Sequence, residues 1–254
     1  MPAFVILGCG YTGQRVARLL VRQGHRVIAT TRDVAALTLD GVDLVHLDVI
    51  EPSRHFALPQ DARVLHSIPV PATEFLEGAS RVVYLSTTGV YGKTLLVDHN
   101  TPIAPSTLRE LARAHEEQRV SSGPWSSLIL RPAAIYGPDR GVHVSMRQGR
   151  HRLWGDGSNY ISRIHVDDLA AISAAALLSD LTGAYPVADD EPCTALEITQ
   201  FAASLFGLPI PPSGDLPGED TRRVNRRVDG SEIRRLFGIK LRYPTYREGL
   251  GSSL

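Results

Sequence analysis

The run AFVILGCGYTG at residues 3–13 decides the fold of this chain. Its first part, residues 3–7, is apolar without interruption, which is typical of a strand buried on both faces in a parallel sheet. A glycine-rich loop follows directly, and apolar residues at helical spacing come after it. The stretch therefore predicts a strand, a tight turn and a helix in immediate succession.

The loop fits the pattern G-x-G-x-x-G in the position where a dinucleotide site needs it, between a strand and a helix. Gly8 allows the tight turn, Gly10 lets the backbone approach a pyrophosphate, and Gly13 allows close packing of helix on strand. The helix N-terminus then offers N–H groups and a partial positive charge to phosphates. The alternative is a structural turn that is merely rich in glycine. The predicted phosphate loop consists of Gly8, Gly10, Tyr11, Thr12 and Gly13.

Outward from this loop, apolar runs alternate with helical patterns, which predicts an α/β fold with a Rossmann-type doubly wound parallel sheet. A smaller C-terminal α/β substrate lobe completes the prediction. We expect an NAD(P)-binding domain over residues 1–138, to which residues 163–190 return, and a mainly substrate-binding lobe over 139–254. Further strands are predicted at 25–31, 42–48, 62–68, 81–87 and 125–132, and helices at 34–39, 106–120, 166–178, 195–207 and 229–238.

Only twelve residues, 69–80, separate the predicted fourth and fifth strands. A parallel crossover normally takes a dozen or more residues and usually a full helix. Two alternatives stay open from the sequence: the helix of this crossover is nearly absent, or a stretch of chain is missing here.

Composition excludes several classes of protein. The chain has 27 Lys+Arg and 27 Asp+Glu, so it lacks the basic excess of a nucleic-acid binder. No apolar run approaches the roughly 20 residues of a membrane helix, and we expect a cytoplasmic protein without nucleic-acid or membrane partners. Two cysteines are too few for a disulfide framework or a cysteine zinc site, and the nine histidines show no metal-ligand spacing, so no metal site is expected.

The end of the second predicted strand bears on the choice of cofactor. An NAD site usually has an acidic residue about 20 residues after the loop, bound to the ribose hydroxyls. Thr31 stands at that strand end, followed by Arg32, whose guanidinium suits a 2′-phosphate. We therefore expect NADP to be preferred over NAD, although Asp33 lies close by and Arg32 could simply be solvated.

Six motifs in order resemble the extended short-chain dehydrogenase/reductase superfamily, the NAD(P)-dependent sugar-nucleotide epimerases and dehydratases. They span nearly the whole chain, and each is short and moderately specific, whereas their order and spacing together are strong. The motifs are GCGYTG at 8–13, LDV at 47–49, YLSTTGVYG at 84–92, LRPAAIYGP at 130–138, RIHVDDLA at 163–170 and YPVADDEP at 185–192.

The resemblance implies roles for individual residues. Asp48 and Val49 correspond to the pair that contacts adenine, Ile68 falls near the ribose, and Pro132 falls near the nicotinamide. Thr87 falls at the catalytic Ser/Thr that hydrogen-bonds the substrate oxygen. The simpler alternatives are a strand-end cap for Asp48 and a polar loop contact for Thr87. The substrate-binding residues implied in this way, including one arginine discussed next, are Thr88, Tyr91, Arg109, Tyr136, Arg163 and His165.

The chain departs from the family pattern in the helix at 106–120. The superfamily uses a Tyr-x-x-x-Lys pair there, in which the lysine lowers the pKa of the tyrosine for acid/base work. This helix contains neither residue type, and the two positions hold Arg109 and Arg113, which stay protonated. Arg113 could bind the cofactor's ribose or a phosphate, and Arg109 an anionic substrate. Alternatively, both are solvated and paired with Glu110, Glu116 or Glu117.

Two functions remain open at this point. The first is an NAD(P)-dependent oxidoreductase or epimerase, monomer or homodimer, acting on a sugar nucleotide or a small carbonyl compound. The second is a non-catalytic NADP-binding sensor or scaffold, which the missing tyrosine favours. An arginine-rich tail suits a nucleotide diphosphate or is a solvated basic face. Its members are Arg222, Arg223, Arg226, Arg227, Arg234 and Arg235.

Overall fold

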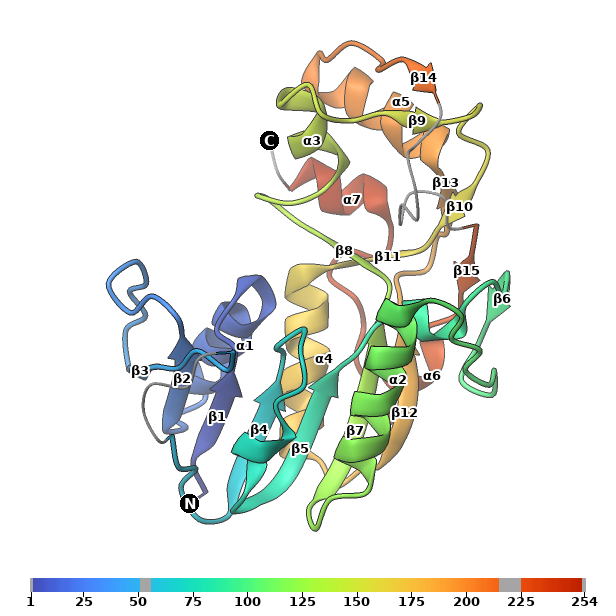
Figure 1. The fold of residues 1–254 in the computed structure, drawn as a ribbon. Helices are drawn as coiled ribbons and strands as arrows, with labels where there is room; N and C mark the ends of the chain where they lie inside the picture. Colours follow the sequence, from blue (N-terminus) through green and yellow to red (C-terminus); the bar gives the residue numbers. More distant parts are fainter. Residues whose placement is uncertain (1, 51–55, 215–224, 253–254) are drawn as a thin grey trace. The chain divides into compact units, whose positions relative to one another are not determined.

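A computed structural model describes residues 2–50, 56–214 and 225–252 of the chain (Figure 1). Contacts divide the chain into two compact units, each described by itself below. The first unit consists of Met1–Val90, Pro105–Arg131 and Leu169–Tyr185, and the second of Tyr91–Ala104, Pro132–Asp168 and Pro186–Leu254.

The first unit is built on a seven-stranded sheet with the order β12-β7-β5-β4-β1-β2-β3. The order runs outward in both directions from the β1–β4 boundary, and the pairs from β3 to β7 are all parallel. This is the doubly wound Rossmann arrangement, so the predicted fold class is confirmed. The strands are β1 (Phe4–Leu7), β2 (Val27–Thr31), β3 (Val42–His46), β4 (Ala62–His66), β5 (Ala79–Leu85), β7 (Ser126–Pro132) and β12 (Gly183–Val187).

Helices cover both faces of this sheet (Figure 1). On one face α1 (Tyr11–Arg22) packs against β1, and α4 (Val166–Leu178) accepts hydrogen bonds from β4 and β5 side chains at its C-terminal end. On the other face lie α2 (Leu108–Ser121) and the 3₁₀ helix η1 (Thr73–Leu76). All four residues of β1 are buried, as a strand covered on both faces requires.

The crossover from β4 to β5 is short but continuous. Its only helical turn is η1, and Ala72 and Leu76 are fully buried in the core beside it. The first alternative, a nearly absent helix, therefore describes this connection, and no extra chain is needed to reach β5.

The helix predicted at 34–39 is wrong. The described residues between β2 and β3 form turns, with the Asp33 carboxylate accepting a hydrogen bond from the Ala36 N–H at 3.0 Å. The Asp33 bond to the backbone three residues on closes a single turn, and six residues are too few to sustain a helix without packing contacts.

The second unit is assembled from short strands paired two by two and from four helices among its described residues. Its core gathers Tyr136, Ile198, Tyr246 and Leu250. The strands are β6 (Leu96–Val97), β8 (Ala134–Tyr136), β9 (Leu153–Trp154), β10 (Tyr160–Ile161), β11 (Arg163–His165), β13 (Cys193–Thr194), β14 (Ser213–Gly214) and β15 (Arg227–Val228); the helices are α3 (Val142–Arg147), α5 (Ala195–Phe206), α6 (Ser231–Phe237) and α7 (Tyr246–Gly251).

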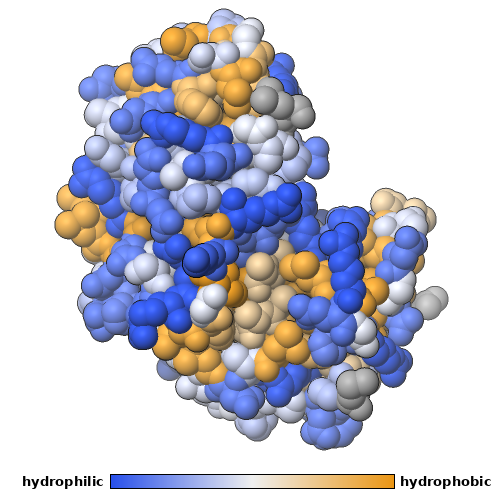
Figure 2. All heavy atoms as spheres, turned by 180° about the vertical axis from the view of Figure 1, so that it is seen from behind, coloured by the Kyte–Doolittle hydropathy of each residue, from blue (hydrophilic) through white to orange (hydrophobic). Residues whose placement is uncertain are grey.

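Hydrophilic and hydrophobic residues are interspersed over the face seen in Figure 2. Within the described ranges, each helix is too short or too polar to cross a membrane. Those same ranges also contain no group of three or more His, Cys, Asp or Glu side chains placed to hold a metal ion.

Candidate functional site

A pocket of about 400 Å³ lies in the first unit, where β1, β2, β3 and β4 end. These four strands flank the point at which the strand order reverses, which is where open α/β sheets bind ligands. The lining residues come from the last two residues of β2 and from the segments that follow the four strands. They are Gly8, Cys9, Gly10, Thr30, Thr31, Arg32, Asp33, Leu47, Asp48, Val49, Ile50, Ser67, Ile68, Pro69 and Val70.

The glycines of the loop are needed for three different reasons. Gly8 has φ +94°, and a Cβ there would lie 2.7 Å from Ile68 Cγ1. A Cβ on Gly13 would lie 2.7 Å from the Gly8 carbonyl oxygen and 2.9 Å from Ile6 Cγ2, so this glycine lets α1 approach β1. A Cβ on Gly10 would meet nothing within 4 Å. Gly10 thus keeps space open beside the backbone at the start of α1.

Two polar residues fix this loop from the neighbouring strands. Thr30 Oγ1, at the end of β2, accepts a hydrogen bond from the Gly8 N–H at 3.0 Å. Ser67 Oγ, just after β4, donates to the Gly8 carbonyl oxygen at 2.6 Å. Sequence reasoning missed both residues. The available signal was their place at the ends of the two strands that flank β1 in a doubly wound sheet.

The start of α1 lies beside the pocket, because its N-cap residue Gly10 is one of the lining residues. Gly10 is the N-cap residue, and none of the described side chains caps it. The guanidinium of Arg15 donates to the Tyr11 carbonyl oxygen at 2.8 Å and lies over the Tyr11 ring. Burial raises the pKa of the Cys9 thiol to about 11, so this pocket residue stays neutral. The uncapped helix start and the room beside Gly10 fit an anionic pyrophosphate.

The residues predicted to select the cofactor also line this pocket. Arg32 and Asp33 are exposed beside the half-buried Thr31. The Asp33 carboxylate is engaged in its turn with Ala36, whereas Arg32 offers an exposed cation to the same pocket. Asp48 accepts a hydrogen bond from the Ile50 N–H at 2.9 Å, so it both stabilises the strand-end turn and lines the pocket.

Helix α2 places the two unexpected arginines next to a second, smaller pocket of about 110 Å³. A capping box of Thr107 and Glu110 starts the helix. Arg113 Nη1 donates to the Tyr84 hydroxyl at 2.9 Å and lies 3.5 Å from the Ile68 carbonyl oxygen. Tyr84 was not among the predicted site residues, because a tyrosine inside an apolar strand run looks like core.

The acids of α2 have other partners. Glu116 Oε1 lies 2.9 Å from His66 Nε2 and accepts from the Ala72 N–H at 3.0 Å. Glu117 holds the buried guanidinium of Arg131 at 2.7 Å. The hydrogen bonds of Glu110 that the structure shows go to the helix start. The alternative in which these acids pair with the two site arginines is therefore not what the structure shows.

The remaining predicted residues are divided between the units. Thr87 and Thr88 follow β5 in the first unit, and Thr87 Oγ1 accepts from the Gly89 N–H at 3.1 Å. Tyr91 and Pro132 belong to the second unit, where Tyr91 is fully buried. A joint role of these four residues in binding cofactor and substrate stays a prediction.

Three predicted substrate residues lie near one another in the second unit. The Tyr136 ring meets the His165 ring edge-on at 5.2 Å, and His165 also packs on Tyr243. Burial raises the pKa of the Tyr136 phenol, so it stays protonated near neutral pH. Arg163 donates to the Ile161 carbonyl oxygen and to Cys193 Sγ at 3.1 Å.

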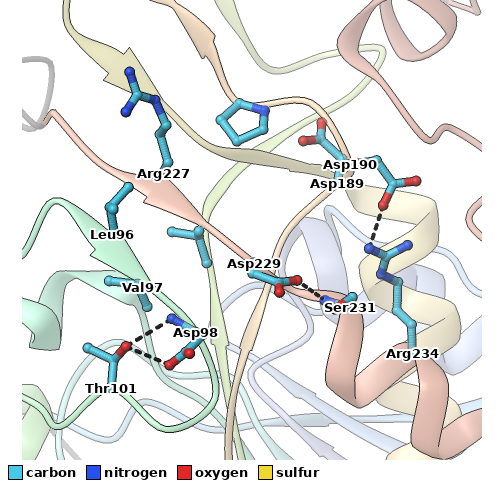
Figure 3. A pocket seen from close by; sticks show the side chains of 12 residues that line it. Leu96, Val97, Asp98, Thr101, Asp189, Asp190, Arg227, Asp229, Ser231 and Arg234 are labelled. Atoms are coloured by element: carbon cyan, nitrogen blue, oxygen red, sulfur yellow. Dashed lines mark hydrogen bonds and ion pairs between the residues drawn. The ribbon is translucent and has the colours of Figure 1, made fainter.

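A third pocket, of about 420 Å³, lies within the second unit (Figure 3). Figure 3 shows Arg234 paired with Asp190, and Asp229 bonded to Ser231. The guanidinium of Arg227 lies 3.7 Å from the centre of the Tyr160 ring. The lining residues are Leu96, Val97, Asp98, Thr101, Asp189, Asp190, Pro192, Arg227, Val228, Asp229, Ser231 and Arg234.

The predicted arginine-rich tail is thus largely engaged. Arg235 pairs with Glu232 at 2.7 Å, and Arg226 donates to the carbonyl oxygens of Thr94 and Gly92. Arg222 and Arg223 lie outside the described residues. The tail is therefore not a continuous basic face where the structure describes it.

The burial of Asp189 in this third pocket predicts that the stability of the protein depends on pH. It is 2% exposed, and burial raises its pKa to about 8, against the opposing effect of Arg163. Below that pKa the folded state holds a proton that the unfolded chain releases above about pH 4. Stability should therefore fall by several kcal/mol as the pH rises from about 4 to 8.

Asp189→Asn mimics the protonated acid and should flatten this part of the profile. Urea unfolding of both proteins at several pH values measures the difference, which we expect to grow in favour of the variant toward pH 8. Parallel profiles for the two proteins would contradict the assignment.

The sheet order and the pocket beside the glycine loop define the class of protein, an α/β protein of the Rossmann type. The model of the NAD dependent epimerase/dehydratase family matches residues 63–187. Over these residues, about half of its length, the chain belongs to this family.

Two curated relatives carry reductase names. The chain is 30% identical over 174 residues to a 3-diazoavenalumate denitrifying reductase of a Streptomyces species, covering 62% of this chain. It spans only 56% of the length of that relative. It is also 28% identical to the 2-alkyl-3-oxoalkanoate reductase of Stenotrophomonas maltophilia, over 82% of this chain and 77% of the relative.

Solved structures are similar to this chain over nearly its whole length. A conserved protein of unknown function from Silicibacter pomeroyi is 30% identical with a TM-score of 0.83, covering 100% of this chain and 98% of the other. The UDP-glucose 4-epimerase of Thermus thermophilus, solved with NAD, is 18% identical with a TM-score of 0.80, covering 98% and 97%. The second similarity supports the fold alone.

Proposed function

We propose that the chain is an NADP-dependent oxidoreductase that acts on a small carbonyl compound. The observation that carries the proposal is the pocket where β1 to β4 end, with its glycine loop and the uncapped start of α1. That arrangement suits the pyrophosphate of a dinucleotide and leaves the backbone close to it. Membership in an NAD-dependent family supports a nicotinamide cofactor of this kind.

The relatives support reduction over epimerisation. Four curated relatives have reductase names. One is named for an oxoalkanoate, a carbonyl compound that carries a carboxylate, and two are named for a dTDP-linked dehydro-deoxy sugar. A sugar nucleotide is the other substrate class, which the similarity to a UDP-glucose 4-epimerase suggests through the fold. The uncompensated arginines of α2 suit either substrate, since both carry anionic groups.

Different residues of the chain would bind different parts of the cofactor and the substrate. The start of α1 and the open space at Gly10 would hold the pyrophosphate, Asp48 and Val49 the adenine side, and Ile68 and Arg113 the ribose. The bound cofactor would supply hydride chemistry at a carbonyl carbon. Thr87, half-buried after β5, would donate a hydrogen bond to the substrate oxygen and so orient the carbonyl group.

The second candidate function is cofactor binding without catalysis, as in a redox sensor or scaffold. The observation in its favour is that α2 contains no tyrosine and no lysine, so the family's usual acid/base pair is not on this helix. The two candidates differ in one measurable outcome. An oxidoreductase consumes NADPH in the presence of a reactive carbonyl compound, and a sensor does not.

Arg32 should decide the preference for NADPH. We expect the protein to bind NADPH more tightly than NADH, because the Arg32 guanidinium can bind the 2′-phosphate in a charge-assisted manner. Arg32→Gln should weaken NADPH binding roughly tenfold or more and leave NADH binding nearly unchanged. Fluorescence titration of both proteins with both cofactors measures this.

Arg22→Gln is the matched control, since Arg22 is an exposed helical arginine outside the pocket. Tenfold tighter binding of NADH by the unmodified protein would refute the preference. Failure to bind either cofactor would refute the proposed function itself.

A further inference from the structure

The smaller pocket of the first unit brings two cations to one place. Arg109 and Arg113 are four residues apart on α2, so they project from the same face of the helix. Both line the pocket of about 110 Å³ together with Pro69, Val70 and Pro71. This segment follows β4 and is the first part of the short crossover. The pocket is therefore lined by the crossover and by α2.

The positive charge in this pocket is only partly balanced. Glu116 also lines it, but its Oε1 atom is taken by His66 and the Ala72 N–H. Burial lowers the pKa of His66, so the ring is neutral near neutral pH. The only charge of this pair is then the negative charge of the Glu116 carboxylate. Across the described part of the chain, neither Arg109 nor Arg113 forms a salt bridge. One positive charge therefore remains in excess at the pocket wall.

A buried hydroxyl adds a third donor. Tyr84 is fully buried, is one of the residues that line the pocket, and accepts a hydrogen bond from Arg113 Nη1 at its hydroxyl oxygen. A phenol can accept one hydrogen bond and donate another. Among the described residues the Tyr84 proton has no acceptor, which leaves it available to a ligand atom in the pocket.

We propose that this pocket is an oxyanion subsite that binds a carboxylate or phosphate group through Arg109, Arg113 and the Tyr84 hydroxyl. Planar guanidinium groups bind both kinds of oxyanion with paired hydrogen bonds. The volume of about 110 Å³ admits such a group but is far smaller than the cofactor pocket. The subsite shares Pro69 and Val70 with that pocket, and its role in substrate recognition rests on the proposed function.

Direct binding of simple oxyanions tests the subsite without a known substrate. Inorganic phosphate and acetate are titrated into the full-length protein by calorimetry, at constant ionic strength. Arg109→Gln and Arg113→Gln should each weaken binding of both ions roughly tenfold or more. Arg109→Lys should retain part of the affinity, because it keeps the charge but loses the planar fork.

Two further variants separate the subsite from general effects. Arg22→Gln removes an exposed helical arginine elsewhere in the same unit and should leave oxyanion binding unchanged. Tyr84→Phe keeps the ring that packs on His66 and removes only the hydroxyl, so it should weaken binding several-fold. Equal affinity in the unmodified protein, Arg109→Gln, Arg113→Gln and Tyr84→Phe would overturn the proposal, as would a failure of the unmodified protein to bind either ion.

A competition experiment identifies the source of the oxyanion. If the group belongs to the substrate, saturating NADPH leaves phosphate binding intact, and Arg109→Gln binds NADPH normally. If it belongs to the cofactor, NADPH displaces phosphate, and Arg109→Gln binds NADPH at least tenfold more weakly. Both results support an oxyanion subsite. A protein that binds phosphate through these arginines but binds no dinucleotide would keep the subsite and refute the proposed function.

Discussion

Gly10→Val is expected to abolish cofactor binding while leaving the fold intact. A side chain at this position meets no protein atom within 4 Å, and the backbone there has φ −86°, which any residue adopts. Valine is a less favourable N-cap residue than glycine, and this difference should lower the free energy of unfolding by less than about 1 kcal/mol. The valine would fill the space that a pyrophosphate needs. We expect an affinity loss of at least a hundredfold, or about 3 kcal/mol.

Gly10→Ala and Gly13→Ala make this experiment selective. The smaller alanine at position 10 should give an intermediate loss of affinity with unchanged stability. Alanine at position 13 would instead press on the Gly8 carbonyl oxygen and Ile6, and should destabilise the protein by about 1–3 kcal/mol. Titration and thermal unfolding of the three variants measure both effects. Normal cofactor affinity in Gly10→Val would mean that the loop does not hold the pyrophosphate.

The largest effect on stability is expected from Glu117→Ala. Glu117 and Arg131 form a buried two-pronged ion pair between α2 and β7, with Nη2–Oε2 at 2.7 Å and Nε–Oε1 at 3.1 Å. The side chains are 5% and 11% exposed. Removing the carboxylate leaves a buried guanidinium without its counter-charge, which typically costs about 3–5 kcal/mol. Because the same helix holds Arg109 and Arg113, oxyanion binding should weaken as well.

The double variant Glu117→Leu with Arg131→Met provides the control. Replacing a buried ion pair with apolar residues of similar size is often neutral or stabilising. Chemical unfolding should therefore show most of the lost stability restored. Equal stability of Glu117→Ala and the unmodified protein would show that the ion pair does not hold α2 on the sheet.

The parts of the fold that follow from local chemistry could be predicted from the sequence. The run at 3–7 had to be a doubly buried strand, and the loop at 8–13 had to follow it. The successive apolar runs determined the strands of the sheet, and a doubly wound order brought the loop together with Arg32, Asp48 and Ile68 in one pocket.

The parts that depend on distant contacts could not be predicted in this way. The hydrogen bonds of Thr30 and Ser67 to Gly8 arise only when three strands lie side by side. The partner of Arg113 is a strand tyrosine 29 residues earlier in the chain, with no spacing rule to reveal it. The helix expected at 34–39 is absent because a helix of six residues depends on packing contacts that the local sequence does not reveal.

The short crossover after β4 has a consequence for how a ligand in one pocket changes the affinity of the other pocket. Pro69 and Val70 belong to the walls of both the larger and the smaller pocket of the first unit. A ligand that shifts this shared wall in one pocket changes the free energy of binding in the other. By thermodynamic reciprocity the effect is equal in both directions. Cooperativity between cofactor and oxyanion would then originate in the two residues that both walls share, Pro69 and Val70.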